Sequence, residues 1–219
     1  MKIIINSHKN STIALNHLLE SMRCQTDFCD FEIIIAIGGY YDLLEYEIFK
    51  EYNITQIKCN HNSIDWTALI VLAECYNNDI NEYYFYLHDT CKVGKNFFSA
   101  IKLIDLNNIT SLRLMSNPPH DPSKNLGIYS QKIINDFKLF LLSKKNTDEK
   151  NLLKCKSINY NEDYIFNNDK CNKLLKYEVT VSEPYDYYKT GTLRKVYYYK
   201  EIDLYKMQAN WGRGWTLNN

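Results

Sequence analysis

The sequence of 219 residues has little glycine and proline, with 7 and 4 residues, and no net charge, because 26 basic and 26 acidic side chains cancel. Without an excess of positive charge the chain cannot be held on a polyanion by counterion release, so we expect no nucleic-acid partner. Hydrophobic residues make up 45% and charged residues 24%. These values allow a buried core and exclude the disordered and collagen-like classes.

Long apolar runs and paired cysteines are also missing. No stretch of about 18 apolar residues occurs, so no membrane span is predicted, and the N-terminus turns polar at Asn6, too early for a signal peptide. The seven cysteines are scattered without a CxxC pair. This pattern fits neither a zinc ribbon nor a disulfide framework, and reduced thiols in the cytoplasm are its simplest explanation.

Glycine-rich phosphate loops are absent as well. Neither GxxxxGK[ST] nor GxGxxG occurs, and two tyrosines follow the only glycine pair, Gly38-Gly39. The sequence therefore gives no motif support to the hypotheses of a P-loop ATPase or a Rossmann dehydrogenase. No GxSxG elbow and no papain-like cysteine context is present, which disfavours serine and cysteine hydrolases.

Short apolar runs alternate with helix-length stretches in the first half of the chain. We expect helices over residues 13–22, 42–51, 64–76 and 96–106, and strands over residues 3–5, 31–37, 54–58, 83–87 and 110–115. Four strand-helix units predict an α/β fold with a right-handed, mostly parallel sheet.

The pattern changes after the prolines of residues 118–122. We expect helices over residues 130–142 and 162–171 and two antiparallel strands over residues 174–181 and 195–200. The length favours a single domain over residues 1–219. Within it, residues 1–116 would form a nucleotide-binding half and residues 117–219 an acceptor-binding half.

Polar residues follow several predicted strands, where ligands bind in an open parallel sheet. They include Ser7 and His8, Gly38, Asn62, and the pair His88-Asp89. A carboxylate at Asp89, at the tip of a rigid strand, can hold Mg²⁺ or Mn²⁺ on a diphosphate, and an imidazole at His88 would favour Mn²⁺. A structural alternative is that Asp89 caps the following turn.

Together, the order and spacing of these motifs resemble the GT-A fold glycosyltransferases, and in particular the small glycosyltransferases of large DNA viruses. The segment YYFYLHDTCKVGKNF is similar to the DXD region of that class, with Asp89 retained. The segment Asn161-Glu162-Asp163 resembles its acidic acceptor-side motif, and residues 62–67 stand where such enzymes contact base and ribose.

This resemblance implies a GT-A-like fold, which is a Rossmann-like, mostly parallel sheet flanked by helices with a smaller antiparallel C-terminal part. It also implies sugar transfer from a nucleotide-diphosphate donor to a glycan or another hydroxyl acceptor, with Mn²⁺ or Mg²⁺ and inversion at the anomeric carbon. A UDP-sugar is the commonest donor of the class.

The resemblance further implies roles for single residues. The nucleoside pocket would be lined by Ser7, His8, Gly38, Asn62 and Asp65, and the metal ion would be held by Asp89 and His88. Asp163, or Glu162 beside it, would deprotonate the acceptor hydroxyl.

A C-terminal segment over residues 206–215 carries two glycines around Arg213 and is expected to be mobile. Lys206 or Arg213 would supply positive charge at the diphosphate. Structural explanations without a catalytic role are also open. Residues 206–215 can be a frayed tail, and Glu162 and Asp163 can be acidic residues that interact with the dipole of the following helix.

Two other functions stay open at this point. One is a metal-dependent nucleotidyl or phosphoryl transferase that uses Asp89 and Asp163 as paired metal ligands. The other is a catalytically silent module that binds a nucleotide or a carbohydrate.

Overall fold

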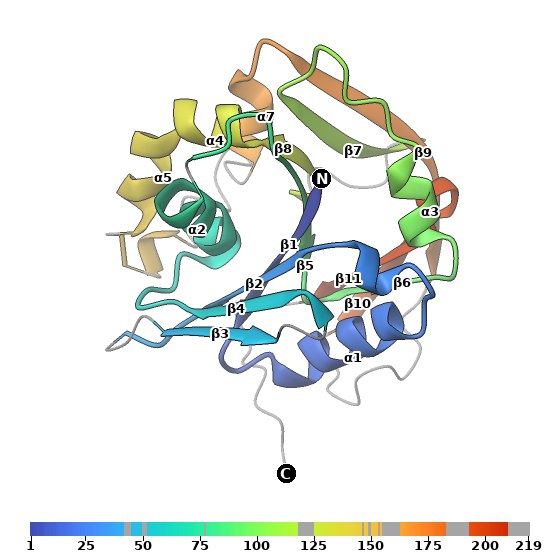
Figure 1. The fold of residues 1–219 in the computed structure, drawn as a ribbon, viewed down its shortest axis with the longest axis horizontal. Coiled ribbons are helices and arrows are strands. Elements are labelled where there is room, and N and C mark those ends of the chain that lie inside the picture. The colour runs from blue at the N-terminus through green and yellow to red at the C-terminus, as the bar shows by residue number, and fades with distance from the viewer. Residues whose placement is uncertain are drawn as a thin grey trace.

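The structure, a computed structural model, describes residues 1–41, 45–49, 52–76, 78–117, 125–145, 147–148, 150–152, 154, 163–182 and 193–209. A twisted sheet runs through the molecule, and helices lie against both of its faces (Figure 1). Within the described residues the strand order is β3-β4-β2-β1-β5-β8-β7-β9-β10-β11-β6. The α/β class predicted from the alternating sequence pattern is confirmed.

The centre of the sheet is parallel, as the strand-helix alternation predicts. It consists of β1 (Lys2–His8), β2 (Ile33–Gly38), β4 (Ile54–Lys58) and β5 (Tyr83–His88). Strand β1 lies between β2 and β5, with Ile5 opposite Ile35 on one side and Leu87 on the other. The carboxyl ends of these strands therefore meet at one edge of the sheet.

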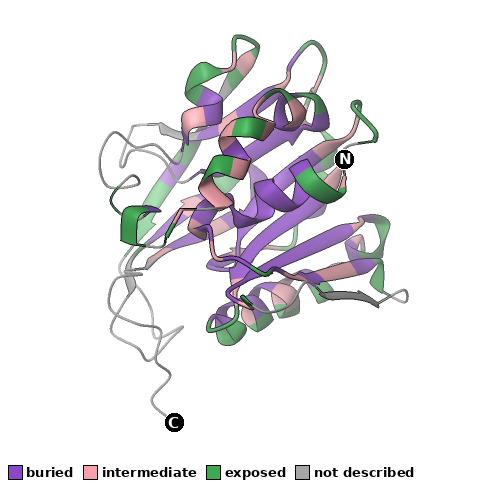
Figure 2. Cartoon of the chain, turned by 90° about the vertical axis from the view of Figure 1, so that its left-hand side faces the viewer, coloured by how far each residue is buried: buried purple, intermediate pink, exposed green. Residues whose placement is uncertain are grey.

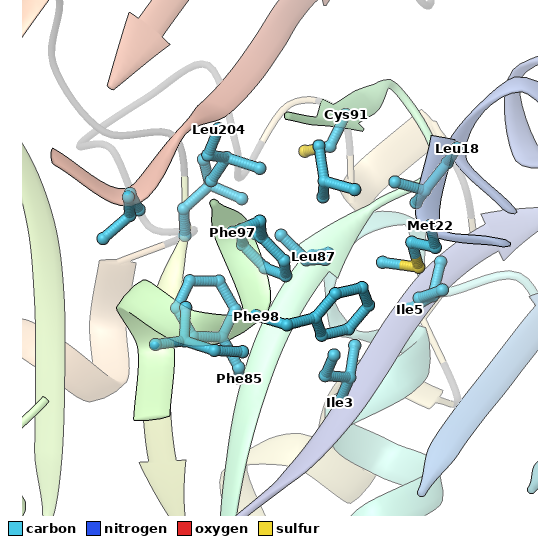
Figure 3. Packing of buried hydrophobic residues seen from close by; sticks show 14 of the residues in the cluster. Ile3, Ile5, Leu18, Met22, Phe85, Leu87, Cys91, Phe97, Phe98 and Leu204 are labelled. Atoms are coloured by element: carbon cyan, nitrogen blue, oxygen red, sulfur yellow. The ribbon is translucent and has the colours of Figure 1, made fainter. Parts of the chain in front are cut away.

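Successive side chains of a strand point to opposite faces, and this alternation divides the core in two. On one face, Ile3, Ile5, Phe85 and Leu87 pack against α1 (Thr12–Arg23) and α3 (Phe97–Lys102), as the labelled side chains in Figure 3 show. On the other face, the side chains between them pack against α2 (Thr67–Cys75), α4 (Gln131–Asp136), α5 (Lys138–Lys145) and α7 (Tyr164–Asn168).

Both faces of the central strands are covered by helices, so these strands are buried along most of their length (Figure 2). Ile3, Ile4 and Ile5 are all fully buried. Continuous apolar runs such as these are expected where a parallel sheet has helices on both faces.

A smaller antiparallel part follows, as expected. Strand β9 (Asn172–Ser182) runs parallel to β7 (Ser111–Asn117), and its last residues pair antiparallel with β10 (Leu193–Tyr199). Strand β11 (Leu204–Ala209) then pairs with β10 and with the short β6 (Cys91–Val93). The C-terminal strands therefore return to the residues that directly follow β5.

Several element predictions were wrong. Residues 45–49, within the expected helix 42–51, form β3 (Glu45–Phe49), an edge strand antiparallel to β4. The alternating segment Glu-Tyr-Glu-Ile suits an edge strand, and pairing with β4 overrides its helical propensity.

The expected helix over residues 130–142 is two helices, α4 and α5, which are separated at Phe137. Strand β8 (Gly127–Ser130) precedes them and was not predicted. It pairs antiparallel with both β5 and β7. Strand β8 therefore lies between these two strands in the sheet, although it follows both of them in the sequence.

No helix in the described part of the chain is long and apolar enough to cross a membrane. None of the six cysteines that the structure describes forms a disulfide.

Candidate functional site

A hydrogen bond joins the ends of β1 and β5. The Ser7 hydroxyl donates to Asp89 Oδ2 at 2.9 Å, and the Asp89 N–H donates to the Asn6 carbonyl at 3.0 Å. Asp89 is fully buried, and its Oδ1 accepts no well-formed hydrogen bond from the described residues, although the buried Ser11 hydroxyl lies near enough to the carboxyl to lower its pKa. A buried carboxylate oxygen that is not fully satisfied can accept a hydrogen bond from a ligand.

The Asp89 carboxyl is also electrostatically unusual. Burial raises its pKa to about 6, although the Ser7 hydrogen bond and the positive charge of Lys206 both lower it. Perturbed carboxyls of this kind concentrate at functional sites. The predicted rigid placement of Asp89 at the tip of a buried strand is in agreement with the geometry.

A buried cation lies beside this carboxyl. Lys206 on β11 has a side chain that is mostly buried, and its ammonium donates to the Thr90 hydroxyl. The Met207 N–H donates to the Thr90 carbonyl at 2.9 Å, so β11 holds Thr90 through both backbone and side chain. Lys206 therefore belongs to a paired strand and not to a mobile tail, which corrects the expectation for its residue. Arg213 lies outside the described residues.

His88 and Asp89 do not meet as a pair of ligands. Consecutive side chains of an extended chain point to opposite faces, so His88 turns toward α2 while Asp89 turns toward Ser7. His88 Nδ1 lies 3.6 Å from Asp65 Oδ1, and the Tyr86 ring packs edge-on against the imidazole with centroids 5.2 Å apart. Within the part of the chain that the structure describes, no three His, Cys, Asp or Glu side chains gather as a metal centre.

Among the described residues, the donor set around Asp89 therefore does not fit a divalent ion held by the protein. One carboxylate oxygen is available, the imidazole is on the other face, and a buried ammonium lies beside the carboxyl. Divalent cations in such sites are bound by several oxygen ligands, and a neighbouring ammonium repels them. The Mn²⁺ or Mg²⁺ implied by the resemblance stays a prediction that these residues do not support.

Asp65 is held by a buried polar network at the entrance to α2. The Tyr86 hydroxyl donates to the Asp65 carbonyl at 2.6 Å, and Asn6 uses its amide to donate to the Ile64 carbonyl and to accept from the Ala68 N–H. Ile64 has a φ of 54°, an uncommon conformation for a β-branched residue. Backbone strain of this kind persists where surrounding contacts fix it, and it clusters at ligand sites.

The other nucleoside-pocket candidates form two close approaches at the same edge. A Cβ on Gly38 would lie 3.4 Å from Asn62 Oδ1 and 3.2 Å from the His61 carbonyl. Gly39 has a φ of +98°, and a Cβ there would lie 2.7 Å from His8 Nε2. Gly38 and Asn62 are thus brought together, as are His8 and Gly39.

Asp163, the predicted base, lies at the start of α7 and is buried. Its Oδ2 forms an ion pair with Arg113 of β7. A chain of contacts connects α7 to Asp65: Phe166 stacks on Tyr129 at 4.5 Å, the Tyr129 hydroxyl donates to Asn125, and the Asn125 amide donates to the Asp65 carbonyl at 3.5 Å. Glu162, its alternative as the base, lies outside the described residues.

Sequence reasoning missed one residue of this region, Arg113. A single cation between the apolar Leu112 and Leu114 signals that Arg113 needs a buried partner. No local sequence pattern predicts that Thr90 is the hydrogen-bond partner of Lys206, which lies 116 positions further along the chain.

No family model and no curated protein matches this sequence. Among solved structures, a fragment of S. aureus TarS matches with a TM-score of 0.47 at 12% identity, over 80% of this chain and 58% of that chain. An active-site mutant of LgtC matches with a TM-score of 0.49 at 11% identity, over 80% and 72%. This chain thus spans 58% of the TarS fragment and 72% of the LgtC chain.

A glycosyltransferase involved in glycosylation of the major capsid of PBCV-1 matches with a TM-score of 0.46 at 13% identity, over 81% of this chain and 83% of that chain. At 11 to 13% identity these matches bear on the fold alone.

Proposed function

We propose that this protein is a glycosyltransferase that moves a sugar from a nucleotide-diphosphate donor to an acceptor hydroxyl. One observation carries the proposal: polar side chains from β1, β5, β11 and the entrance to α2 converge at the carboxyl edge of the parallel strands. An open α/β sheet binds its ligands at this edge. The resemblance of the motif order to GT-A enzymes supports the same function.

In this proposal the donor nucleoside lies between the ends of β1, β2 and the entrance to α2. Asn62 and Asp65 offer acceptors for base or ribose hydroxyls, Gly38 allows close approach, and Ser7 and His8 line the floor. A UDP-sugar is the proposed donor, because uridine is the commonest base of the class.

Asp89 and Lys206 are proposed to lie at the diphosphate and the donor sugar. Asp89 Oδ1 would accept a hydrogen bond from a hydroxyl of the ribose or the sugar, since a buried acceptor that is not fully satisfied can take one. Lys206, and Arg213 from the C-terminal segment, would face the diphosphate. TarS has been crystallised with UDP-GlcNAc, and LgtC with donor and acceptor sugar analogues.

The proposed reaction is a single displacement. The acceptor oxygen forms a bond to the anomeric carbon, the bond from that carbon to the diphosphate oxygen breaks, and the diphosphate leaves with the electron pair. Asp163, or Glu162 beside it, takes the proton of the acceptor hydroxyl. Attack from the face opposite to the leaving group inverts the anomeric configuration.

A transferase that pairs Asp89 with Asp163 on metal ions is not favoured. Asp163 Oδ2 is bound to Arg113, and Asp89 bonds to Ser7 of the first strand. Each carboxylate is thus held by a different part of the fold, Asp163 by β7 and Asp89 by β1.

Thermal unfolding with UDP, GDP, CMP and ADP tests the proposal. A ligand at 100 times its dissociation constant stabilises by about 2.7 kcal/mol, which raises the melting temperature by several degrees. We expect UDP to give this shift in the wild type and in the control Asp105→Asn, which changes an exposed carboxylate, and a clearly smaller shift in Asp89→Asn. If no nucleotide shifts the wild type, and no UDP-sugar is turned over, the protein is not a glycosyltransferase.

A further inference from the structure

The cation at the donor site is part of the protein's own sheet. The Lys206 ammonium is buried beside the Asp89 carboxyl and donates to Thr90, the residue that follows it. Asp89 Oδ1, also buried, accepts no well-formed hydrogen bond from the described residues, with the Ser11 hydroxyl nearby. A positive charge and an open acceptor thus lie together at the end of β5.

The backbone around Lys206 makes this charge rigid. Lys206 lies opposite Cys91 in the β11–β6 ladder, and β11 also pairs along its length with β10. The side chain reaches from this register position back to Thr90, where the Met207 N–H also binds. A cation fixed by two neighbouring strands needs no rearrangement before it meets a charged ligand, and preorganised charge is the most effective kind in catalysis.

We propose that Lys206, positioned by Thr90, is the cation that compensates the donor diphosphate, and that donor binding and sugar transfer need no divalent metal ion. This inference rests on the proposed function and assigns the charge within that site. An ammonium has three N–H donors, and diphosphate oxygens are strong acceptors for them. When the bond from the anomeric carbon to the diphosphate breaks, the electron pair moves to the leaving oxygen, and the Lys206 charge stabilises it.

The position of Asp89 agrees with this assignment. Its carboxyl feels the positive charge of Lys206, so the buried ammonium has a counter-charge nearby. A divalent ion bound at Asp89 would lie close to that ammonium and be repelled by it. His88, the other residue expected as a metal ligand, is directed to Asp65.

Binding of UDP and of uridine, measured by calorimetry in EDTA and in Mn²⁺, tests the inference. We expect wild-type affinity for UDP in EDTA to lie within about threefold of that in Mn²⁺. Lys206→Met should weaken UDP binding about 10- to 100-fold in both buffers, as loss of a charged hydrogen bond does, and leave uridine binding unchanged. A purely structural role for Lys206 would weaken uridine binding as well.

Lys206→Arg keeps the charge and should retain most of the UDP affinity. Lys92→Met is a matched control, because Lys92 is on the neighbouring strand β6 and contacts the Tyr205 ring instead. It should bind UDP like the wild type. If Lys206→Met does not fold, Thr90→Val, which removes only the hydroxyl partner of the ammonium, should lower the ratio of UDP to uridine affinity in the same direction.

The outcomes separate this inference from the proposed function. UDP binding that disappears in EDTA overturns the inference while the glycosyltransferase proposal stands. Equal UDP affinity in the wild type and Lys206→Met overturns it as well. Failure of the wild type to bind UDP or any other nucleotide in either buffer rejects both.

Discussion

The Ser7 hydroxyl on the first strand donates a hydrogen bond of 2.9 Å to the Asp89 carboxylate, 82 positions further along the chain. Both groups are buried, so the bond is shielded from water. It fastens the carboxyl ends of β1 and β5 at the edge where the proposed donor binds. The contact therefore serves the stability of the sheet and the position of the Asp89 carboxylate together.

Ser7→Ala is expected to destabilise the protein by about 1 to 3 kcal/mol, because it leaves a buried carboxylate oxygen without its donor. Urea unfolding monitored by circular dichroism measures this free energy. Ser99→Ala is the control, because its hydroxyl is exposed and donates to the Asn96 carbonyl, away from Asp89. A loss in Ser99→Ala as large as in Ser7→Ala would contradict the assigned role of the Ser7–Asp89 bond.

The buried Asp163 forms an ion pair with Arg113, which is itself only partly exposed, so removal of Arg113 takes the positive charge away from a buried carboxylate. Arg113→Met is expected to cost about 3 to 5 kcal/mol of unfolding free energy. Asp163→Asn should lower kcat for sugar transfer about 100- to 10,000-fold if Asp163 is the base, with little change in UDP affinity.

The control for this pair is Asp136→Asn, which removes an exposed carboxylate that pairs with Lys132 on α4. Its kcat and its stability should stay close to those of the wild type. A fully active Asp163→Asn protein would leave the pair with a structural role only, and the acceptor base would have to be sought elsewhere.

The buried His61 side chain is expected to make the protein less stable in acid. Burial lowers its pKa to about 4, helped by the positive charge of Lys145 and opposed by Glu74, while its Nδ1 lies 2.8 Å from the Ser63 hydroxyl. The unfolded chain, with an ordinary histidine pKa near 6.5, binds more protons between about pH 4 and 6.5, so stability falls as the pH drops through this range.

At pH 5 the His61 contribution amounts to roughly 2 kcal/mol of lost stability relative to pH 7, as the linkage relation gives for these two pKa values. Unfolding free energies of the wild type and His61→Asn at pH 7 and pH 5 measure it. The variant should lose less stability than the wild type between these pH values. Parallel losses in both proteins would show that the acid sensitivity originates in other groups.

A side chain at Gly127 is expected to disturb the sheet by steric overlap. A Cβ at this position would collide with the Leu112 carbonyl of β7 and approach Phe166 of α7 at 2.7 Å. Backbone atoms cannot move aside without disturbing the β7–β8 pairing, so Gly127→Ala should cost at least about 2 kcal/mol. In Gly38→Ala the nearest atoms would lie 3.2 Å or more from the new Cβ, so this variant should lose less unfolding free energy. Thermal unfolding of both variants measures the two losses. The reverse order would contradict this account.

Elements with one dominant local pattern could be predicted from the sequence. The apolar runs of β1, β2 and β5 and the amphipathic α1 lie where expected, because burial on both faces or on one stripe leaves a direct signature. Short strands such as β3, β6 and β8 were missed. Their pairing partners are distant in the sequence, and strand propensity depends on such partners.

In the candidate site, too, the residues with a local sequence signal could be named, and the contacts between distant residues could not. Ser7, Asp65 and Asp89 were named because each follows a predicted strand or begins a helix, where an α/β sheet binds ligands. The pairing of His88 with Asp89 as metal ligands had no support, because alternation along the strand sends their side chains to opposite faces. Glu162 and Arg213 lie outside the described residues and stay predictions.

The sequence by itself determined the α/β class and the parallel centre of the sheet, and it predicts that a ligand binds at the carboxyl edge of that sheet. Hydrophobic periodicity and the polar residues that end each strand are local properties, so no partner is needed to read them. Only the tertiary structure decided which polar and charged side chains meet. Lys206 reaches Thr90, and Arg113 pairs with Asp163, through strands and helices that are far apart in the chain. Such contacts depend on sheet order and register, which chain folding sets globally.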